Sequence, residues 1–159
     1  MAWRYPLNTD IDVPILPNLG AFAAVRKNHT HEGVDLYVKP CAVVHAVEDG
    51  IVVRVIPFTG EIAGSPWWNN TQAVLVEGES GVVVYGEIRS VVKVGEELIA
   101  GNVVGDVLTV LKKDKGRPMS MLHLELHIHG TRDVYEWLVD GPKPESLLDP
   151  TEFLLTAIP

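Results

Sequence analysis

The sequence predicts an all-β protein, an antiparallel barrel or sandwich with little helix, and two observations carry this prediction. Short runs rich in β-branched residues recur along the 159 residues, and many short strands at close spacing are typical of barrels and sandwiches. In chain order these runs are 34–38, 41–47, 50–58, 72–78, 81–88, 102–111 and 122–129. No long amphipathic helix pattern is present, and only the stretch 149–158 suits one or two helical turns.

Turn residues separate these runs and support the strand boundaries. Asp49-Gly50 marks the start of the third run, Glu79-Ser80-Gly81 marks the boundary between the fourth and the fifth, and Gly95-Glu96 lies before the sixth. The longest loop candidate is 58–71, which contains Trp67 and Trp68. Two interpretations of this pair stay open: the aromatics cover one end of the barrel, or they form one wall of a substrate groove.

Length and composition indicate one soluble globular domain over 1–159. The formal net charge of −8 argues against sequence-independent binding to nucleic acid or to anionic membranes, because both repel an acidic surface. No apolar run approaches the roughly 18 residues of a membrane span. The first residues lack the order of a signal peptide, so the compartment is not predicted. Cys41 is the only cysteine, which excludes an internal disulfide, and we expect it in the core or in a strand.

The first candidate for chemistry is the stretch "NHTHEGVDLYV", residues 28–38, which contains His31 and Asp35 in an H-x-G-x-D pattern. Imidazole and carboxylate are both good zinc ligands. Gly33 between them allows a tight turn, so two side chains four residues apart can converge without a helix. Solvent-facing polar groups give the same pattern, and a zinc site needs a third protein ligand from elsewhere.

The second candidate is "MLHLELHIHG", residues 121–130, where strand alternation separates two faces. One face is apolar, and the other carries Met121, His123, Glu125, His127 and His129. A half-exposed edge strand gives the same alternation. Together with His31 and Asp35, however, this second histidine cluster indicates a metal site.

The order of these motifs resembles the lysostaphin/LytM-type zinc metalloendopeptidases. The chain carries "HEGVDLYVKPCAVVHAVEDGIVVRV", then "VVVYGEI", "VVKVGEELIAGNVVGDV", "MLHLELH" and a closing "LLDPTEFLL". These five landmarks fall in the family's order and cover about residues 29–155. The resemblance implies an antiparallel β-barrel or sandwich of the duplicated-hybrid-motif type. It also implies Zn²⁺ bound by His31, Asp35 and His123, with a fourth position open for water.

Two positions depart from the family pattern. The histidine that follows the family's tyrosine is Glu87 here, and the histidine that opens "H-L-H" is Met121. A methionine can neither polarise water nor stabilise an oxyanion. Alternation predicts Glu87 on the same side as Tyr85, where its carboxylate would act as general base toward water with Tyr85 assisting. His127 and His129 match no site position of the family and are expected at the surface, although the pair "HIH" is a rival choice of metal ligands.

The resemblance implies hydrolysis of peptide cross-links in peptidoglycan, or of glycine-rich peptides, in the cell envelope or as part of a phage particle. The altered positions keep a second hypothesis open: a zinc-binding but inactive module that binds a peptide or partner, or regulates other hydrolases. A third hypothesis, a biotinyl or lipoyl carrier, lacks the expected modified-lysine motif. The oligomeric state is not predicted.

Overall fold

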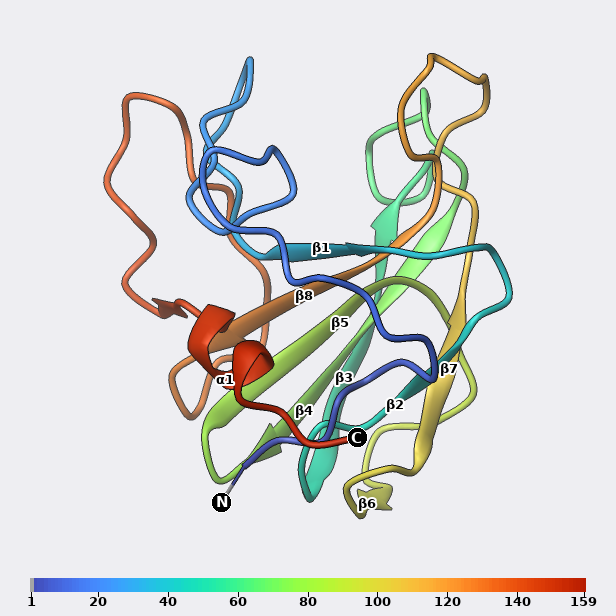
Figure 1. Ribbon diagram of the computed structural model, residues 1–159, viewed down its shortest axis with the longest axis vertical. Helices are drawn as coiled ribbons and strands as arrows, with labels where there is room; N and C mark the ends of the chain where they lie inside the picture. The colour runs from blue at the N-terminus through green and yellow to red at the C-terminus, as the bar shows by residue number, and fades with distance from the viewer. Residues whose placement is uncertain (1) are drawn as a thin grey trace.

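The computed structural model describes residues 2–159 and confirms the all-β prediction (Figure 1). The strands pair in antiparallel fashion, and the one α-helix among the described residues has five residues. The elements are β1 (Val34–Tyr37), β2 (Val43–His45), β3 (Gly50–Thr59), β4 (Thr71–Gly78), β5 (Gly81–Ser90), β6 (Glu97–Leu98), β7 (Val103–Val107), β8 (Met121–His127), β9 (Leu147–Leu148) and α1 (Thr151–Leu155).

The strands form one hydrogen-bonded sheet whose main order is β1-β8-β5-β4-β3-β6. β7 pairs with both β2 and β5, and β9 pairs with β8. β8 therefore lies between β1 and β5 and is not an edge strand. All seven of its residues are buried, which removes the half-exposed edge as an explanation of its alternating pattern.

Each face of the sheet covers its own apolar cluster, as period-two alternation requires. The larger cluster includes Leu36, Val83 and Tyr85, together with the leucines of β8. The smaller one contains Leu75 and Val84. The polar residues of β8 point to the face opposite its leucines, where β5 presents Val84 and Gly86 as their cross-strand partners.

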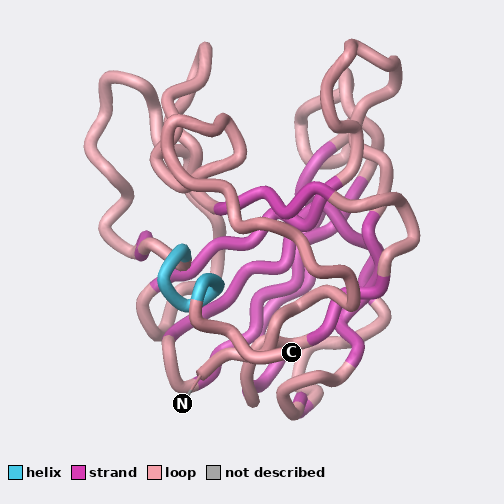
Figure 2. The backbone as a smooth tube through the Cα atoms, viewed as in Figure 1, coloured by secondary structure: helices cyan, strands magenta, loops and turns pink. Residues whose placement is uncertain are grey.

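The two ends of the molecule differ (Figure 2). Long loops gather at the end near β1 and β8, whereas the chain termini lie together at the other end. There the backbone N–H of Tyr5 donates to the carbonyl of Ile158 at 2.7 Å, and Trp3 stacks on Phe153 with ring centroids 4.8 Å apart. Within residues 2–159, no helix has the length and apolar character needed to cross a membrane.

One minor expectation is wrong. Cys41 is exposed and precedes β2, with a φ of 71° and its backbone N–H bonded to the carbonyl of Val107. The segment 41–47 contributes only three strand residues, because the chain turns at Cys41 before the pairing with β7 begins.

Candidate metal centre

The structure brings His31, Asp35 and His123 together at a buried point beside β1 and β8. His31 Nε2 lies 3.2 Å from Asp35 Oδ1 and 3.3 Å from His123 Nδ1, and His123 Nδ1 lies 2.8 Å from Asp35 Oδ1. The three side chains are almost without solvent exposure. Three donor atoms thus converge on one small region, although His31 and His123 lie 92 positions apart in the sequence.

Strand register explains this convergence. Asp35 in β1 is the direct cross-strand partner of His123 in β8, so their side chains leave the same face of the sheet. His31 lies just before β1 and folds back over Asp35. Gly33 permits this approach for a different reason from the turn we expected: a Cβ there would collide with the carbonyl oxygen of Leu124 on β8.

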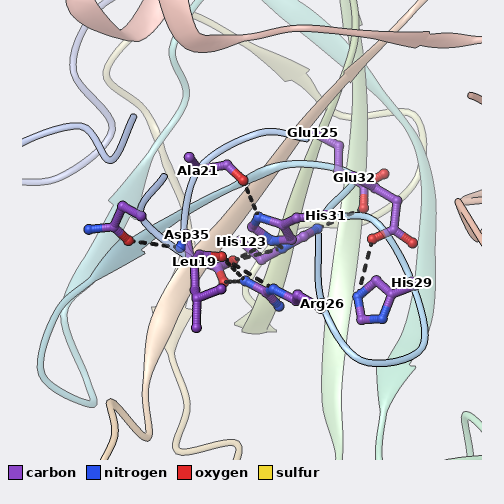
Figure 3. Close-up of polar contacts among 11 residues, drawn as sticks. Leu19, Ala21, Arg26, His29, His31, Glu32, Asp35, His123 and Glu125 are labelled. Atoms are coloured by element: carbon purple, nitrogen blue, oxygen red, sulfur yellow. Dashed lines mark hydrogen bonds and ion pairs between the residues drawn. The ribbon is translucent and has the colours of Figure 1, made fainter. Parts of the chain in front are cut away.

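Each of the three side chains has its remaining polar atom held by a further group (Figure 3). His31 Nδ1 donates to the carbonyl of Ala21 at 2.9 Å, which leaves its Nε2 lone pair facing the cluster. Asp35 Oδ2 accepts from Arg26 Nη2 at 2.9 Å, so Oδ1 is the oxygen available to a metal. Outer partners of this kind fix the orientation and tautomer of metal ligands.

His123 is held by a longer buried chain of hydrogen bonds. Its Nε2 donates to Glu125 at 2.7 Å, and the other oxygen of Glu125 accepts from His127 Nε2 at 2.8 Å. His127 Nδ1 in turn accepts from the hydroxyl of Ser146 at 2.8 Å. His127 has no solvent exposure, so the expectation that it is a surface residue is wrong: β8 is a central strand, and the residue serves to position Glu125.

The donor set fits a zinc ion. Ligands of a tetrahedral zinc ion, at bond lengths of about 2.0–2.1 Å, lie about 3.3 Å from one another. The three separations in this cluster are 2.8, 3.2 and 3.3 Å. Two imidazoles and one carboxylate are typical of catalytic zinc sites, which take three protein ligands and leave one position open. His31, Asp35 and His123 can therefore hold such an ion.

The carboxylates and histidines of the cluster stabilise one another's charged forms. Although burial alone would raise the pKa of Asp35, the two histidines hold it well below its usual range. Burial acts likewise on Glu125, but hydrogen bonds from His123 and His127 lower its pKa to about 2. His123 lies between these carboxylates, and despite burial its pKa is well above the ordinary value. In the metal-free protein both ring nitrogens of His123 face carboxylate oxygens, which favours the form with a proton on each nitrogen.

Zinc binding is accordingly expected to release a proton. Asp35 and Glu125 raise the pKa of His123, and Nδ1 donates its proton to Asp35 Oδ1 at 2.8 Å, so a metal must displace that proton. Apparent affinity should fall about tenfold for each pH unit below this pKa. Calorimetric titration with zinc at pH 7 in Pipes and in Hepes measures the proton count. Equal heats in the two buffers, with affinity unchanged between pH 5 and 8, would contradict this expectation.

Glu87 reaches the cluster through a β-bulge that alternation did not predict. Gly86 pairs with Ala73 and Ile88 with Gln72, so Glu87 is an extra residue without a partner on β4. Its φ of 66° is rare for a non-glycine residue and turns the side chain away from the direction of Tyr85. Burial and the nearby carboxylate of Asp35 raise the pKa of Glu87 to about 8. Its buried Oε2 has no hydrogen-bond partner among the described residues.

Tyr85 does not join this site. It is fully buried in the larger apolar cluster, and its hydroxyl accepts a hydrogen bond from the backbone N–H of Val47 at 2.9 Å. The prediction that Tyr85 and Glu87 share one side is therefore wrong, because the bulge interrupts the period-two rule between them. The geometry gives Tyr85 a structural position and leaves it no access to a metal at His123.

Two further groups lie against His123. The ring of Phe58 from β3 is 5.3 Å from the His123 ring, centroid to centroid. A Cβ at Gly86 would lie 2.8 Å from a carbon of this ring, so glycine is required where Phe58 crosses β5. Met121, two residues before His123, is buried on the same face and offers no hydrogen-bond donor.

The remaining sequence candidates lie outside the cluster. Trp67 is 63% exposed and meets Trp68 edge-on at 5.8 Å. Trp68 pairs with Leu111, so this loop is joined to the loop that precedes β8. His129 is exposed, with Nε2 2.9 Å from the carbonyl of Gly78, and lies outside the metal-binding group. Because His127 is engaged by Glu125 and Ser146, the geometry does not support the rival pair of ligands.

Several solved structures share this fold at low sequence identity. The catalytic domain of the antimicrobial peptidase lysostaphin from Staphylococcus simulans matches with a TM-score of 0.57 and 16% identity, covering 91% of this chain and 92% of that one. A zinc-containing peptidase from Vibrio cholerae matches with a TM-score of 0.57 and 16% identity, covering 100% and 41%. Helicobacter pylori Csd3 matches with a TM-score of 0.50 and 21% identity, covering 88% and 37%.

The chain therefore has the fold of the lysostaphin-type peptidases. It spans less than half the length of the Vibrio cholerae and Helicobacter pylori chains. No protein-family model matches the sequence, and comparison with curated protein sequences finds no match.

Proposed function

We propose that the protein is a zinc metallopeptidase that hydrolyses peptide cross-links of peptidoglycan, with Glu87 as the general base. The observation that carries the proposal is the buried convergence of His31, Asp35 and His123 on a lysostaphin-type fold. Zinc held by these residues would supply Lewis-acid activation of water and of the scissile carbonyl.

Glu87 has the properties that a base requires at this position. Its Oε2 is free of hydrogen bonds within residues 2–159 and is therefore available to a water molecule. A pKa of about 8 in the metal-free protein falls when a divalent cation adds positive charge beside it, which brings the carboxylate toward the ionised form at neutral pH. Glu87 would take a proton from the attacking water and return it to the amine that leaves when the peptide bond breaks.

Met121 favours one alternative: a zinc-binding module without catalytic activity, which binds a peptide or partner or regulates another hydrolase. At this position the side chain cannot donate a hydrogen bond to a developing oxyanion. The exposed Trp67 supports a substrate groove under either function, because exposed aromatics often mark recognition surfaces.

Incubation of the zinc-loaded protein with purified peptidoglycan and with pentaglycine tests the proposal. We expect new amino groups to accumulate, and we expect a chelator to abolish them and added zinc to restore them. Binding of either substrate without any cleavage at micromolar protein would establish the inactive module instead.

A further inference from the structure

Tyr37 lies where the site lacks a hydrogen-bond donor. In the β1–β8 pairing, Tyr37 is the direct partner of Met121, just as Asp35 is the partner of His123. Residues two apart in a strand share a face, so Tyr37 lies on the metal-binding face next to Asp35 and across from Met121.

The phenol is directed toward the loop that covers the metal-binding residues. A Cβ at Gly20 would lie 2.9 Å from the Tyr37 oxygen, so the hydroxyl occupies the space beside Gly20 that a side chain there would fill. The carbonyl of Gly20 accepts the backbone N–H of Asp35 at 2.9 Å, which places this contact immediately beside a metal-binding residue. Tyr37 is only half-buried, and its hydroxyl makes no hydrogen bond to the described part of the chain.

The phenol hydroxyl of Tyr37 can donate a hydrogen bond. Arg26 is less available for the same purpose, because its guanidinium is already bonded to Asp35 and to the carbonyl of Leu19.

We propose that the hydroxyl of Tyr37 donates a hydrogen bond to the carbonyl oxygen of the substrate as negative charge develops on it. This would make Tyr37 a catalytic residue that supplies from β1 the donor that Met121 lacks on β8. The inference rests on the proposed function, since the oxyanion forms only when a peptide carbonyl is attacked. Donors aimed at such an oxygen are worth about 10²- to 10³-fold in kcat.

Tyr37→Phe tests this role because it removes only the hydroxyl. We expect kcat on pentaglycine to fall about 10²-fold with KM changed little. A second readout does not depend on turnover: the affinity of the zinc-loaded protein for a triglycine analogue in which a phosphinate replaces one peptide bond. The phosphinate oxygen copies the oxyanion, so Tyr37→Phe should weaken this binding by a similar factor, while zinc affinity stays within about twofold.

Tyr135→Phe is the matched control, because Tyr135 is an exposed tyrosine outside the metal-binding cluster. We expect its kcat and phosphinate affinity to equal those of the unchanged protein. Equal phosphinate affinity in Tyr37→Phe and the unchanged protein would overturn the role of Tyr37, as would a complete lack of phosphinate binding. If the phosphinate binds through Tyr37 but no peptide is cleaved, the proposed peptidase activity fails, whereas the hydrogen bond from Tyr37 to the bound phosphinate oxygen stands.

Discussion

His123→Ala is expected to abolish tight zinc binding. Structural zinc sites with four protein ligands contribute about 10–16 kcal/mol in binding free energy, so one ligand accounts for about 2.5–4 kcal/mol, or about 10²- to 10³-fold in affinity. His123 also connects Asp35 to Glu125 through hydrogen bonds of 2.8 and 2.7 Å. The alanine variant loses both a metal ligand and the partner of two buried carboxylates. Competition with a chromophoric chelator measures the affinity, and elemental analysis measures the bound zinc.

His129→Ala is the control for this experiment. His129 lies beyond the end of β8 and is exposed, so its removal should leave zinc affinity unchanged. Loss of a partner for a buried charge costs about 3–5 kcal/mol of folding stability, so circular dichroism must accompany the measurement. His123→Asn, which keeps a polar group of smaller size, serves if the alanine variant does not fold. Equal zinc loss at both positions would show that His123 is the wrong histidine.

Much of the site followed from the sequence because its geometry obeys simple periodicity. Alternation along 121–129 placed His123 and Glu125 on one face, and the H-x-G-x-D spacing placed His31 within reach of Asp35. What periodicity does not provide is strand register. The pairing of Asp35 with His123, which are 88 positions apart in the chain, and that of Tyr37 with Met121 depend on how β1 aligns with β8. Tyr37 therefore gave no signal as a site residue in the sequence.

The wrong or missing predictions concern residues whose positions depend on tertiary contacts and not on local sequence patterns. His127 was expected at the surface because strand polarity alone does not distinguish a central strand from an edge strand. Arg26 belongs to a loop and reaches Asp35 through backbone turns that no short motif encodes. Glu87 is the clearest case, since a single residue with positive φ reverses the direction that alternation assigns to its side chain. Non-glycine residues in this conformation cost free energy and concentrate at functional sites.

Glu87→Gln is expected to remove peptidase activity while zinc binding remains. Glutamine has nearly the same shape but cannot accept the proton of the attacking water, and a positioned base contributes about 10²- to 10⁴-fold in rate. Because Glu87 is absent from the group of three that can hold a metal, zinc affinity should change little. Glu97→Gln provides a matched control at an exposed position of β6. Cleavage of pentaglycine at the unchanged rate by zinc-loaded Glu87→Gln would exclude Glu87 as the base.

Glu87→Gln should remove activity, but it should increase the free energy of unfolding of the metal-free protein at alkaline pH. The pKa of Glu87 in the folded state is about 8, above its ordinary value of 4.5, so the folded state binds more protons than the unfolded state between these values. Glu87 therefore lowers the free energy of unfolding as pH rises from about 5 to 8, by at most about 1.4 kcal/mol for each pH unit in that interval. Glu87→Gln should remove this decline, so the metal-free variant should be more stable than the unchanged protein at pH 8 and similar to it at pH 5. Urea unfolding at the two pH values measures the difference, and an equal decline in both proteins would show that Glu87 is ionised in the folded state.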